Sequence, residues 1–280
     1  MVTQKVVFDR LVDVYDASEI EFFKPVARTL LGHLGIRPGE HVLDVGCGRG
    51  AVLFPAAAAA GPGGRVVGID ISAAMVEATA AQAADLPGVE VLEMDGQRPP
   101  LPARSFDVLT GSMSVGLFPD LSGAFAHYAT LLRPGGRLGI TSPVPPENLR
   151  SWRLGPLRVG RIIEEIDVDA AVAANPRMAA FLGDHPFGRP GDIAAKLAAA
   201  GFEDVVEHRQ DVELVASSAR SIIEWTWSNG LRLFWDLVPA DRRAAIEADL
   251  VRDLEANATG GRVTAAYPVG YHLARLPLEA

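Results

Sequence analysis

The chain has 280 residues, of which 49% are hydrophobic, a fraction typical of a globular protein with a closed core. Its formal net charge is −9, from 26 Lys and Arg against 35 Asp and Glu, so a nucleic-acid backbone would be repelled on average. Cys47 is the only cysteine, which excludes an intrachain disulfide and a cysteine-based metal cluster.

The sequence lacks the run of ~20 uncharged apolar residues that a membrane span needs. Charged residues also precede any apolar stretch long enough for a signal peptide. We therefore expect a cytoplasmic protein without membrane or nucleic-acid partners. The alanine-rich composition, with Arg far more frequent than Lys, is typical of a GC-rich bacterial genome.

Taken in chain order, the first predicted element is an amphipathic helix from Ile20 to Leu34, which follows Ser18 and Glu21 in the spacing of a capping box. Apolar runs and helical stretches then alternate. The expected strands are 41–45, 65–69, 89–94, 106–111 and 137–141, and the helices between them are 51–60, 73–85 and 121–132. This alternation predicts an α/β fold with a doubly wound, Rossmann-like and mostly parallel sheet.

Beyond Thr141 the alternation is interrupted twice, and two further strands bring the predicted sheet to seven. We divide the chain, as one domain overall, into a lid helix and core (1–142), a first cap insertion (143–190), a core helix and strand (191–216), a second helical cap insertion (217–260) and a final core strand (261–280). Ligands of such folds bind at the carboxyl edge of the sheet. Both insertions are expected at that edge, where they would roof a pocket.

The most informative segment is the glycine turn DVGCGRGA at residues 44–51, between the first strand and its helix. Glycines permit a tight turn and allow backbone N–H groups to approach a ligand closely. Gly46, Gly48 and Ala51 also satisfy the dinucleotide fingerprint, and Asp70 lies where such a fold binds a ribose hydroxyl. The glycine turn by itself is therefore also compatible with an NAD(P)-dependent oxidoreductase.

Three additional features favour another family. Asp44 directly precedes the turn, Asp95 ends the third strand, and the segment LRPGG at residues 132–136 leads into the fifth strand. With the glycine turn, these residues resemble the class I S-adenosylmethionine-dependent methyltransferases, including small-molecule members similar to those of ubiquinone and menaquinone biosynthesis and to actinobacterial tailoring enzymes. The resemblance covers residues 11–138 well and the remainder loosely.

The resemblance implies S-adenosyl-L-methionine as cofactor and S-adenosyl-L-homocysteine as product. The cofactor-binding candidates that it implies are Tyr15, Asp44, Gly46, Cys47, Gly48, Asp70, Ile71, Met75, Asp95, Gly96 and Ser112. In the family, the positions of Asp44 and Ser112 lie at the methionine part, Asp70 at the ribose and Asp95 at the adenine amine. The chemistry of the cofactor supports these positions, because three carboxylates can bind its cationic end, its ribose diol and its hydrogen-bond-donating amine. Helix capping or turn formation is the competing explanation for these aspartates.

Catalytic residues are harder to identify, because a sulfonium methyl group is already electrophilic and alignment alone can promote its transfer. Many relatives carry a histidine shortly after the fourth strand, where this chain has MSVGLF at residues 113–118. His185, in a loop that the topology places over the pocket, is the candidate catalytic base. His127 in a helix and His272 in a strand are expected to be structural.

For the substrate pocket, the candidates are Met113, Phe118, Trp225 and Trp227. The tryptophans lie in a helix that is apolar on nearly all sides, so cap packing or a homodimer contact would explain them equally well. The acidic residues 164, 165, 167 and 169 are typical of a solvated helix face, and no metal is predicted.

These observations predict a methyltransferase that acts on a small, fairly apolar molecule, with the methylated atom (oxygen, nitrogen or carbon) left open. The oxidoreductase is disfavoured because a helix precedes the first strand and because Asp44 and Asp95 have no comparable role there. A methyltransferase-like cyclase or binding protein also stays open at this point. A protein-methylating enzyme is disfavoured, because the cap insertions would exclude a bulky substrate.

Overall fold

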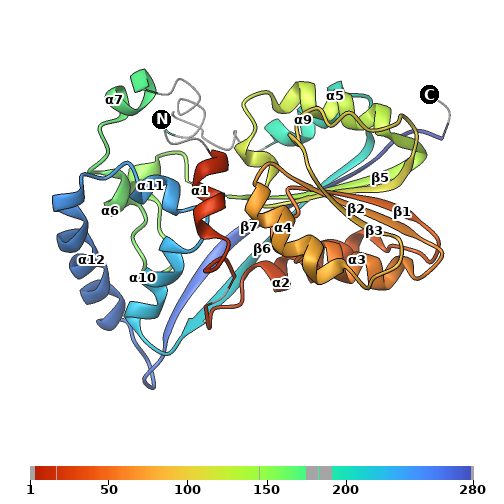
Figure 1. The fold of residues 1–280 in the computed structure, drawn as a ribbon. Coiled ribbons are helices and arrows are strands. Elements are labelled where there is room, and N and C mark those ends of the chain that lie inside the picture. The colour runs from red at the N-terminus through yellow and green to blue at the C-terminus, as the bar shows by residue number, and fades with distance from the viewer. Residues whose placement is uncertain (1–3, 17, 145, 175–181, 183–190, 279–280) are drawn as a thin grey trace. The chain divides into compact units, whose positions relative to one another are not determined.

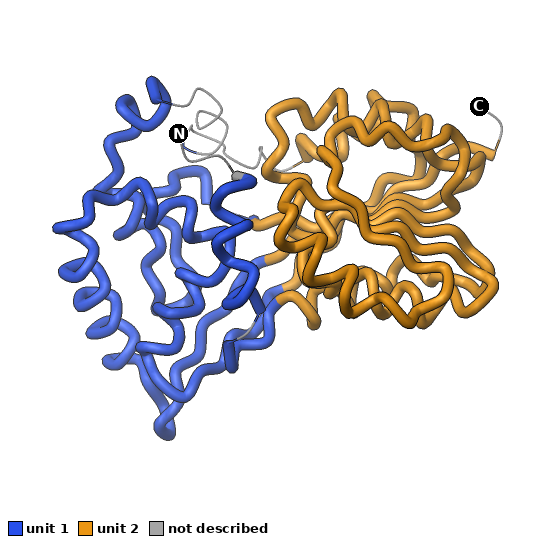
Figure 2. Tube along the Cα trace, viewed as in Figure 1, with its two compact units in different colours: residues 1–22, 144–187, 211–268 blue, residues 23–143, 188–210, 269–280 orange. Residues whose placement is uncertain are grey.

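The computed structural model describes residues 4–16, 18–144, 146–174, 182 and 191–278. The chain forms two compact units (Figure 2). Unit 1 consists of residues 1–22, 144–187 and 211–268, and unit 2 of residues 23–143, 188–210 and 269–280. Most of the two predicted cap insertions falls within the residues of unit 1.

The seven-stranded sheet has the order β3-β2-β1-β4-β5-β7-β6 (Figure 1). Its strands are β1 (His41–Val45), β2 (Arg65–Asp70), β3 (Val89–Glu93), β4 (Phe106–Ser112), β5 (Leu132–Pro143), β6 (Glu203–Ala216) and β7 (Val263–Arg275). Strands β1 to β5 pair in parallel, and β7 pairs with β5 in antiparallel fashion. The sequence prediction of an α/β fold with a mostly parallel seven-stranded sheet is confirmed.

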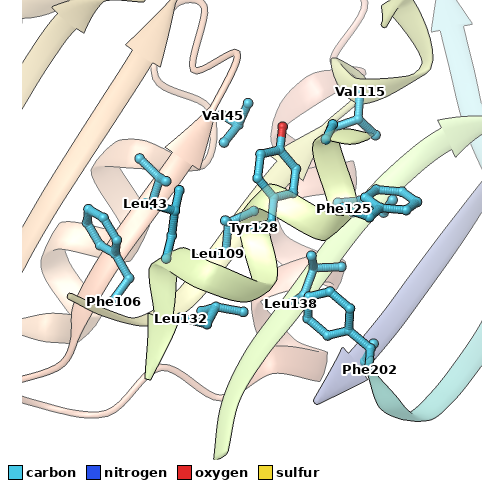
Figure 3. Close-up of a cluster of buried hydrophobic side chains, with 14 of the residues drawn as sticks. Leu43, Val45, Phe106, Leu109, Val115, Phe125, Tyr128, Leu132, Leu138 and Phe202 are labelled. Carbon is cyan, nitrogen blue, oxygen red and sulfur yellow. The ribbon is translucent and has the colours of Figure 1, made fainter. Parts of the chain in front are cut away.

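Helices of unit 2 cover this sheet. They are α2 (Phe23–Leu34), α3 (Leu53–Ala60), α4 (Ala73–Ala83), the short 3-10 helix η1 (Val115–Leu117), α5 (Leu121–Leu131) and α9 (Asp192–Ala199). A core cluster lies between the central strands and α5, where Leu43, Leu109, Phe125, Tyr128 and Leu138 are excluded from solvent (Figure 3). Full burial of each such side chain contributes about 1.5–3 kcal/mol, which makes this core the rigid support of the strand ends.

Unit 1 is mainly helical among the residues that the structure describes. Its helices are α1 (Gln4–Leu11), η2 (Leu149–Ser151), α6 (Gly160–Ile163), α7 (Val168–Ala174), α10 (Ala219–Trp227), α11 (Arg232–Trp235) and α12 (Ala240–Glu255). An aromatic cluster fills its interior, with the Tyr267 ring centroid 4.7 Å from that of Phe22 and 6.1 Å from that of Trp225. None of the described helices combines the length and the apolarity that crossing a membrane would require.

The predicted start of the first amphipathic helix is wrong. The Ser18 hydroxyl does accept a hydrogen bond from a backbone N–H, that of Ile20, at 3.2 Å, but in a turn, and α2 begins only at Phe23. Proline is tolerated in the first turn of a helix and not in its interior, so Pro25 sets this late start. Helix α1, which the sequence patterns did not predict, precedes it.

Candidate active site

Three aspartates lie at the ends of neighbouring strands in unit 2. Asp44 is in β1, Asp70 ends β2, and Asp95 follows β3, and these three strands are parallel neighbours. Their carboxyl ends therefore lie at one edge of the sheet. The order of the strands reverses between β1 and β4, and such a switch point is where open α/β sheets bind their ligands.

The glycine turn after β1 is held to the next strand through backbone hydrogen bonds. The N–H groups of Gly46 and Cys47 both donate to the carbonyl oxygen of Ile69, at 2.8 and 3.0 Å. Gly46 has a φ of 69°, and a Cβ atom added there would lie 2.4 Å from the Cβ of Ser114. The turn thus requires glycine at this position for both conformation and space.

Asp70 connects this turn to the start of α4. Its Oδ2 accepts a hydrogen bond from the N–H of Gly48 at 2.9 Å, and its Oδ1 accepts one from the N–H of Ser72 at 2.9 Å. Ser72 in turn caps α4, because its hydroxyl accepts from the N–H of Met75 at 3.2 Å, as the sequence predicts. A single carboxylate therefore orders the glycine turn and a helix N-terminus together.

Asp44 is buried, with 1% of its surface exposed. Its Oδ1 accepts a hydrogen bond from the Thr110 hydroxyl at 2.8 Å, whereas its Oδ2 has no hydrogen-bond partner among the residues that the structure describes. Desolvation raises the pKa of Asp44 to about 7; the Thr110 hydrogen bond and the nearby backbone N–H of Leu53 oppose this rise, and the charge of Asp70 adds to it. A buried carboxylate with an unpartnered oxygen suits a ligand that brings a positive charge.

Gly96 and Phe118 meet beside the end of β3. A Cβ atom on Gly96 would lie 2.6 Å from Cγ1 of Val45 and 2.8 Å from Cζ of Phe118, so a larger residue would require these side chains to shift. The Gly96 carbonyl accepts a hydrogen bond from the Tyr128 hydroxyl at 2.6 Å. Asp95 is exposed, and its Oδ1 accepts from the N–H of Gln97 at 2.9 Å.

A strained turn follows β4. Met113 has a φ of 55°, and its N–H donates to the Thr141 hydroxyl oxygen at 2.9 Å. The hydroxyls of Ser112 and Thr141 are 3.1 Å apart, and the Ser114 hydroxyl donates to the carbonyl of Val45 at 2.6 Å. The sequence prediction included Ser112 and Met113 but missed Thr141 and Ser114, whose signal was their position at the ends of two parallel strands.

Ile71 and Met75, whose positions flank adenine in the family that the sequence resembles, differ in exposure. Ile71 is 39% exposed, whereas Met75 is 1% exposed and belongs to the interior. Cys47 is buried, and its Sγ lies 3.0 Å from where a Cβ on Gly68 would stand. Of these residues, Ile71 is therefore the one that offers apolar surface at the edge of the sheet.

The remaining candidates belong to unit 1. Tyr15 makes an edge-to-face contact with Phe8, and Trp225 is buried against Phe22. Trp227 stacks on Trp235 at 4.8 Å. Further contacts of Trp227 are with Glu247, which accepts from its Nε1 at 2.8 Å, and with Arg232 and Arg243, whose guanidinium groups lie over its ring. These contacts hold both tryptophans within unit 1, and a substrate role for either tryptophan stays a prediction.

The remaining predictions concern the histidines, the acidic segment and a metal site. His185, the candidate base, lies outside the described residues. His127 makes a structural contact, with its Nε2 2.9 Å from the carbonyl oxygen of Pro99. Glu165 pairs with Arg161 and Arg242 at 2.8 and 3.1 Å, so this part of the acidic segment is engaged in ion pairs. Among the described residues, no three His, Cys, Asp or Glu side chains are grouped to hold a metal ion.

Comparison with known proteins identifies the family. A family model described as a methyltransferase domain matches residues 42–136. The chain is 60% identical over 272 residues to nocamycin O-methyltransferase of Saccharothrix syringae, an alignment that covers 96% of this chain and 97% of that protein. The chain belongs to the class I S-adenosylmethionine-dependent methyltransferases. The oxidoreductase hypothesis is not supported, and S-adenosyl-L-methionine is the cofactor of this methyltransferase.

A further relative and two solved structures are also similar to this chain. The methyltransferase is 47% identical over 139 residues to aklanonic acid methyltransferase DauC of a Streptomyces strain, covering 49% of this chain and 63% of that one. Phosphoethanolamine N-methyltransferase 2 of Haemonchus contortus, solved with S-adenosylhomocysteine, has a TM-score of 0.60 at 15% identity, covering 99% of this chain and 61% of that one. The cyclase SpnF has a TM-score of 0.54 at 22% identity, covering 91% and 81%. The two solved structures show the shared fold alone.

The buried carboxylate predicts that cofactor binding is linked to protons. Because the pKa of Asp44 is raised to about 7, the free protein holds this carboxyl protonated below that pH, whereas a cationic ligand favours the carboxylate. A cofactor held by Asp44 should therefore release a proton on binding, and affinity for S-adenosylmethionine should fall up to about tenfold per pH unit below 7. Calorimetric titration at about pH 6 and about pH 8 measures this. Asp44→Asn should abolish the dependence, and equal wild-type affinities at both pH values would refute it.

Proposed function

We propose that this methyltransferase transfers the methyl group to an oxygen atom of a small, largely apolar natural product. The observation that carries the proposal is the 60% identity to nocamycin O-methyltransferase along nearly the whole length of both chains. When bound, S-adenosylmethionine supplies a methyl group on a sulfonium centre that an aligned oxygen can attack directly.

The composition of unit 2 near the strand ends is in keeping with an apolar acceptor. Met113, Leu117 and Phe118, all partly exposed, follow β4 in close succession, and the segment 113–118 contains no histidine. A base for the acceptor oxygen, where one is needed, must then come from another element. Asp44, Asp70 and Asp95 are proposed to hold the cofactor, at the methionine end, the ribose and the adenine amine.

A product screen tests the proposal. The purified protein would be incubated with S-adenosylmethionine and, in parallel, with nocamycin lacking its O-methyl group and with aklanonic acid, the compounds that the names of two relatives suggest. We expect one added methyl group, assigned to oxygen by NMR, together with S-adenosylhomocysteine. Methylation at nitrogen or carbon would refute the O-methyl assignment, and a product without an added methyl group would favour a cyclase.

Three wider predictions remain proposals. They are a location in the cytoplasm, the absence of nucleic-acid and membrane partners, and a homodimer. The net charge of −9 supports the second of these, since it opposes binding to phosphate backbones. Sedimentation analysis of the purified protein would decide between monomer and dimer.

A further inference from the structure

A second polar cluster in unit 2 joins three neighbouring strands. The hydroxyl of Ser142 in β5 lies 3.0 Å from Nε2 of His272 in β7, and Nδ1 of His272 lies 2.7 Å from Oε1 of Glu207 in β6. Ser142 and His272 are buried, at 3% and 7% exposure, whereas the Glu207 side chain is 35% exposed. The three groups thus lead from a buried hydroxyl to the surface.

The chemistry of the three groups determines which nitrogen of His272 carries a proton and which can accept one. A carboxylate repels the lone pair of an unprotonated nitrogen, so the Glu207 oxygen 2.7 Å from Nδ1 of His272 favours the ring form with the proton on Nδ1. The contact is a close approach rather than an aligned hydrogen bond, and Nδ1 has no other partner among the described residues. Nε2 then presents its lone pair to the hydroxyl proton of Ser142. This tautomer leaves His272 able to take up a proton from the serine side.

Burial and one neighbouring carboxylate determine the pKa of His272. Burial lowers the pKa of His272, and the nearby Glu207 opposes this effect. Among the described residues, no other charged group shifts the pKa of His272. His208, the residue after Glu207 in β6, stacks on His33 instead, with the ring centroids 4.7 Å apart. The ring of His272 is therefore neutral at neutral pH, with one carboxylate placed to stabilise its cation.

Position links the cluster to the candidate active site. Ser142 directly follows Thr141, whose hydroxyl and carbonyl oxygens accept from the N–H of Met113 at 2.9 and 3.1 Å. Thr141 also pairs with Ser112 in the β4–β5 register. Ser142 is thus one residue from the turn at the carboxyl end of β4, on the strand next to it.

We propose that Ser142, His272 and Glu207 form a proton relay that removes the proton of the acceptor hydroxyl during methyl transfer. The inference rests on the proposed O-methyl function. As the acceptor oxygen forms its bond to the methyl carbon, the methyl–sulfur bond breaks and its electron pair remains on sulfur. The acceptor proton passes to the oxygen of Ser142, the Ser142 proton passes to Nε2 of His272, and Glu207 stabilises the resulting imidazolium. Glu207 then provides the exit to solvent.

Kinetic measurements with the acceptor from the product screen test the relay. General-base catalysis contributes roughly 10²–10⁴-fold, so His272→Gln and Ser142→Ala should each lower kcat by on the order of 100-fold. Affinity for S-adenosylhomocysteine should remain unchanged, which separates the effect from loss of folding. Glu207→Gln removes the group that raises the His272 pKa, so the acidic limb of its pH–rate profile should move to lower pH. A purely structural cluster would not move that limb.

Matched variants complete the experiment. Glu203→Gln, on an exposed residue of the same strand, and His208→Gln, on the adjacent histidine, should retain the wild-type rate and pH profile. An unchanged rate in His272→Gln would overturn the relay, as would an unshifted acidic limb in Glu207→Gln. Should His272→Gln fail to bind S-adenosylhomocysteine, Glu207→Gln alone decides, because its side chain is partly exposed at the surface.

An NMR measurement needs no acceptor and separates this inference from the proposed function. In the wild-type protein, the imidazole nitrogen signals of His272 should show a protonated Nδ1 and an unprotonated Nε2 at neutral pH. A cationic ring or the opposite tautomer would refute the relay even if O-methyl product forms. Conversely, failure of the wild type to make any O-methyl product would refute the proposed function, whatever the tautomer of His272.

Discussion

Replacing Asp70 with alanine should reduce the affinity for S-adenosylmethionine by at least about 100-fold, which corresponds to roughly 2.7 kcal/mol. Two effects combine. The ribose hydroxyls assigned to this carboxylate lose charge-assisted hydrogen bonds, each contributing about 1.5–3 kcal/mol. The N–H groups of Gly48 and Ser72 also lose their acceptor, so the glycine turn and the start of α4 are no longer held together.

Calorimetric titration with S-adenosylmethionine and S-adenosylhomocysteine measures this loss. Asp85→Ala is the matched control, because Asp85 is an exposed aspartate just beyond the other end of α4 and should retain wild-type affinity. Thermal unfolding of both variants separates local loss of the site from global unfolding. Wild-type affinity in Asp70→Ala would show that the cofactor is not held at the end of β2.

Gly46→Ala should destabilise unit 2 and disrupt the glycine turn. The new Cβ atom would lie 2.4 Å from Cβ and 2.9 Å from Oγ of Ser114, and the backbone has a φ of 69°. A left-handed conformation costs a non-glycine residue about 1–2 kcal/mol, and overpacking adds typically 1–3 kcal/mol. We therefore expect a loss of about 2–5 kcal/mol in the free energy of unfolding, visible as a lower melting temperature.

A glycine elsewhere in unit 2 provides the control. Gly32 lies in α2 with open space around it, so Gly32→Ala should be neutral or stabilising by up to about 1 kcal/mol through helix propensity. Combining Gly46→Ala with Ser114→Gly removes the clashing Cβ atom and should recover part of the lost stability. Equal melting temperatures for Gly46→Ala and Gly32→Ala would contradict the geometry of the turn.

Much of the core follows from local patterns. The strand predicted at residues 41–45 has the same bounds as β1. Four of its five residues are buried, and a parallel strand that is covered on both faces has a mostly apolar sequence. Since parallel strands end at one edge, the same patterns place Asp44, Asp70 and Asp95 together. The family of cofactor-binding proteins can therefore be predicted from the sequence.

Local patterns are less informative where the chain leaves this alternation. They do not predict helix α1 or the late start of α2, because a residue pair with capping spacing forms a turn instead. The position of His272 in a strand, taken alone, indicates a structural residue. Its contacts come from Ser142, 130 residues away in the sequence, and from Glu207 on another strand.

The sequence by itself determined the α/β fold, the glycine turn and the set of acidic residues at the strand ends, because short-range periodicity and turn chemistry encode them. Only the tertiary structure decided which hydroxyls hold the turn after β4, why the pKa of Asp44 is raised, and how Ser142, His272 and Glu207 meet. Those features depend on burial and on the antiparallel register of β5 and β7 across long insertions, which are set by the packing of the whole sheet.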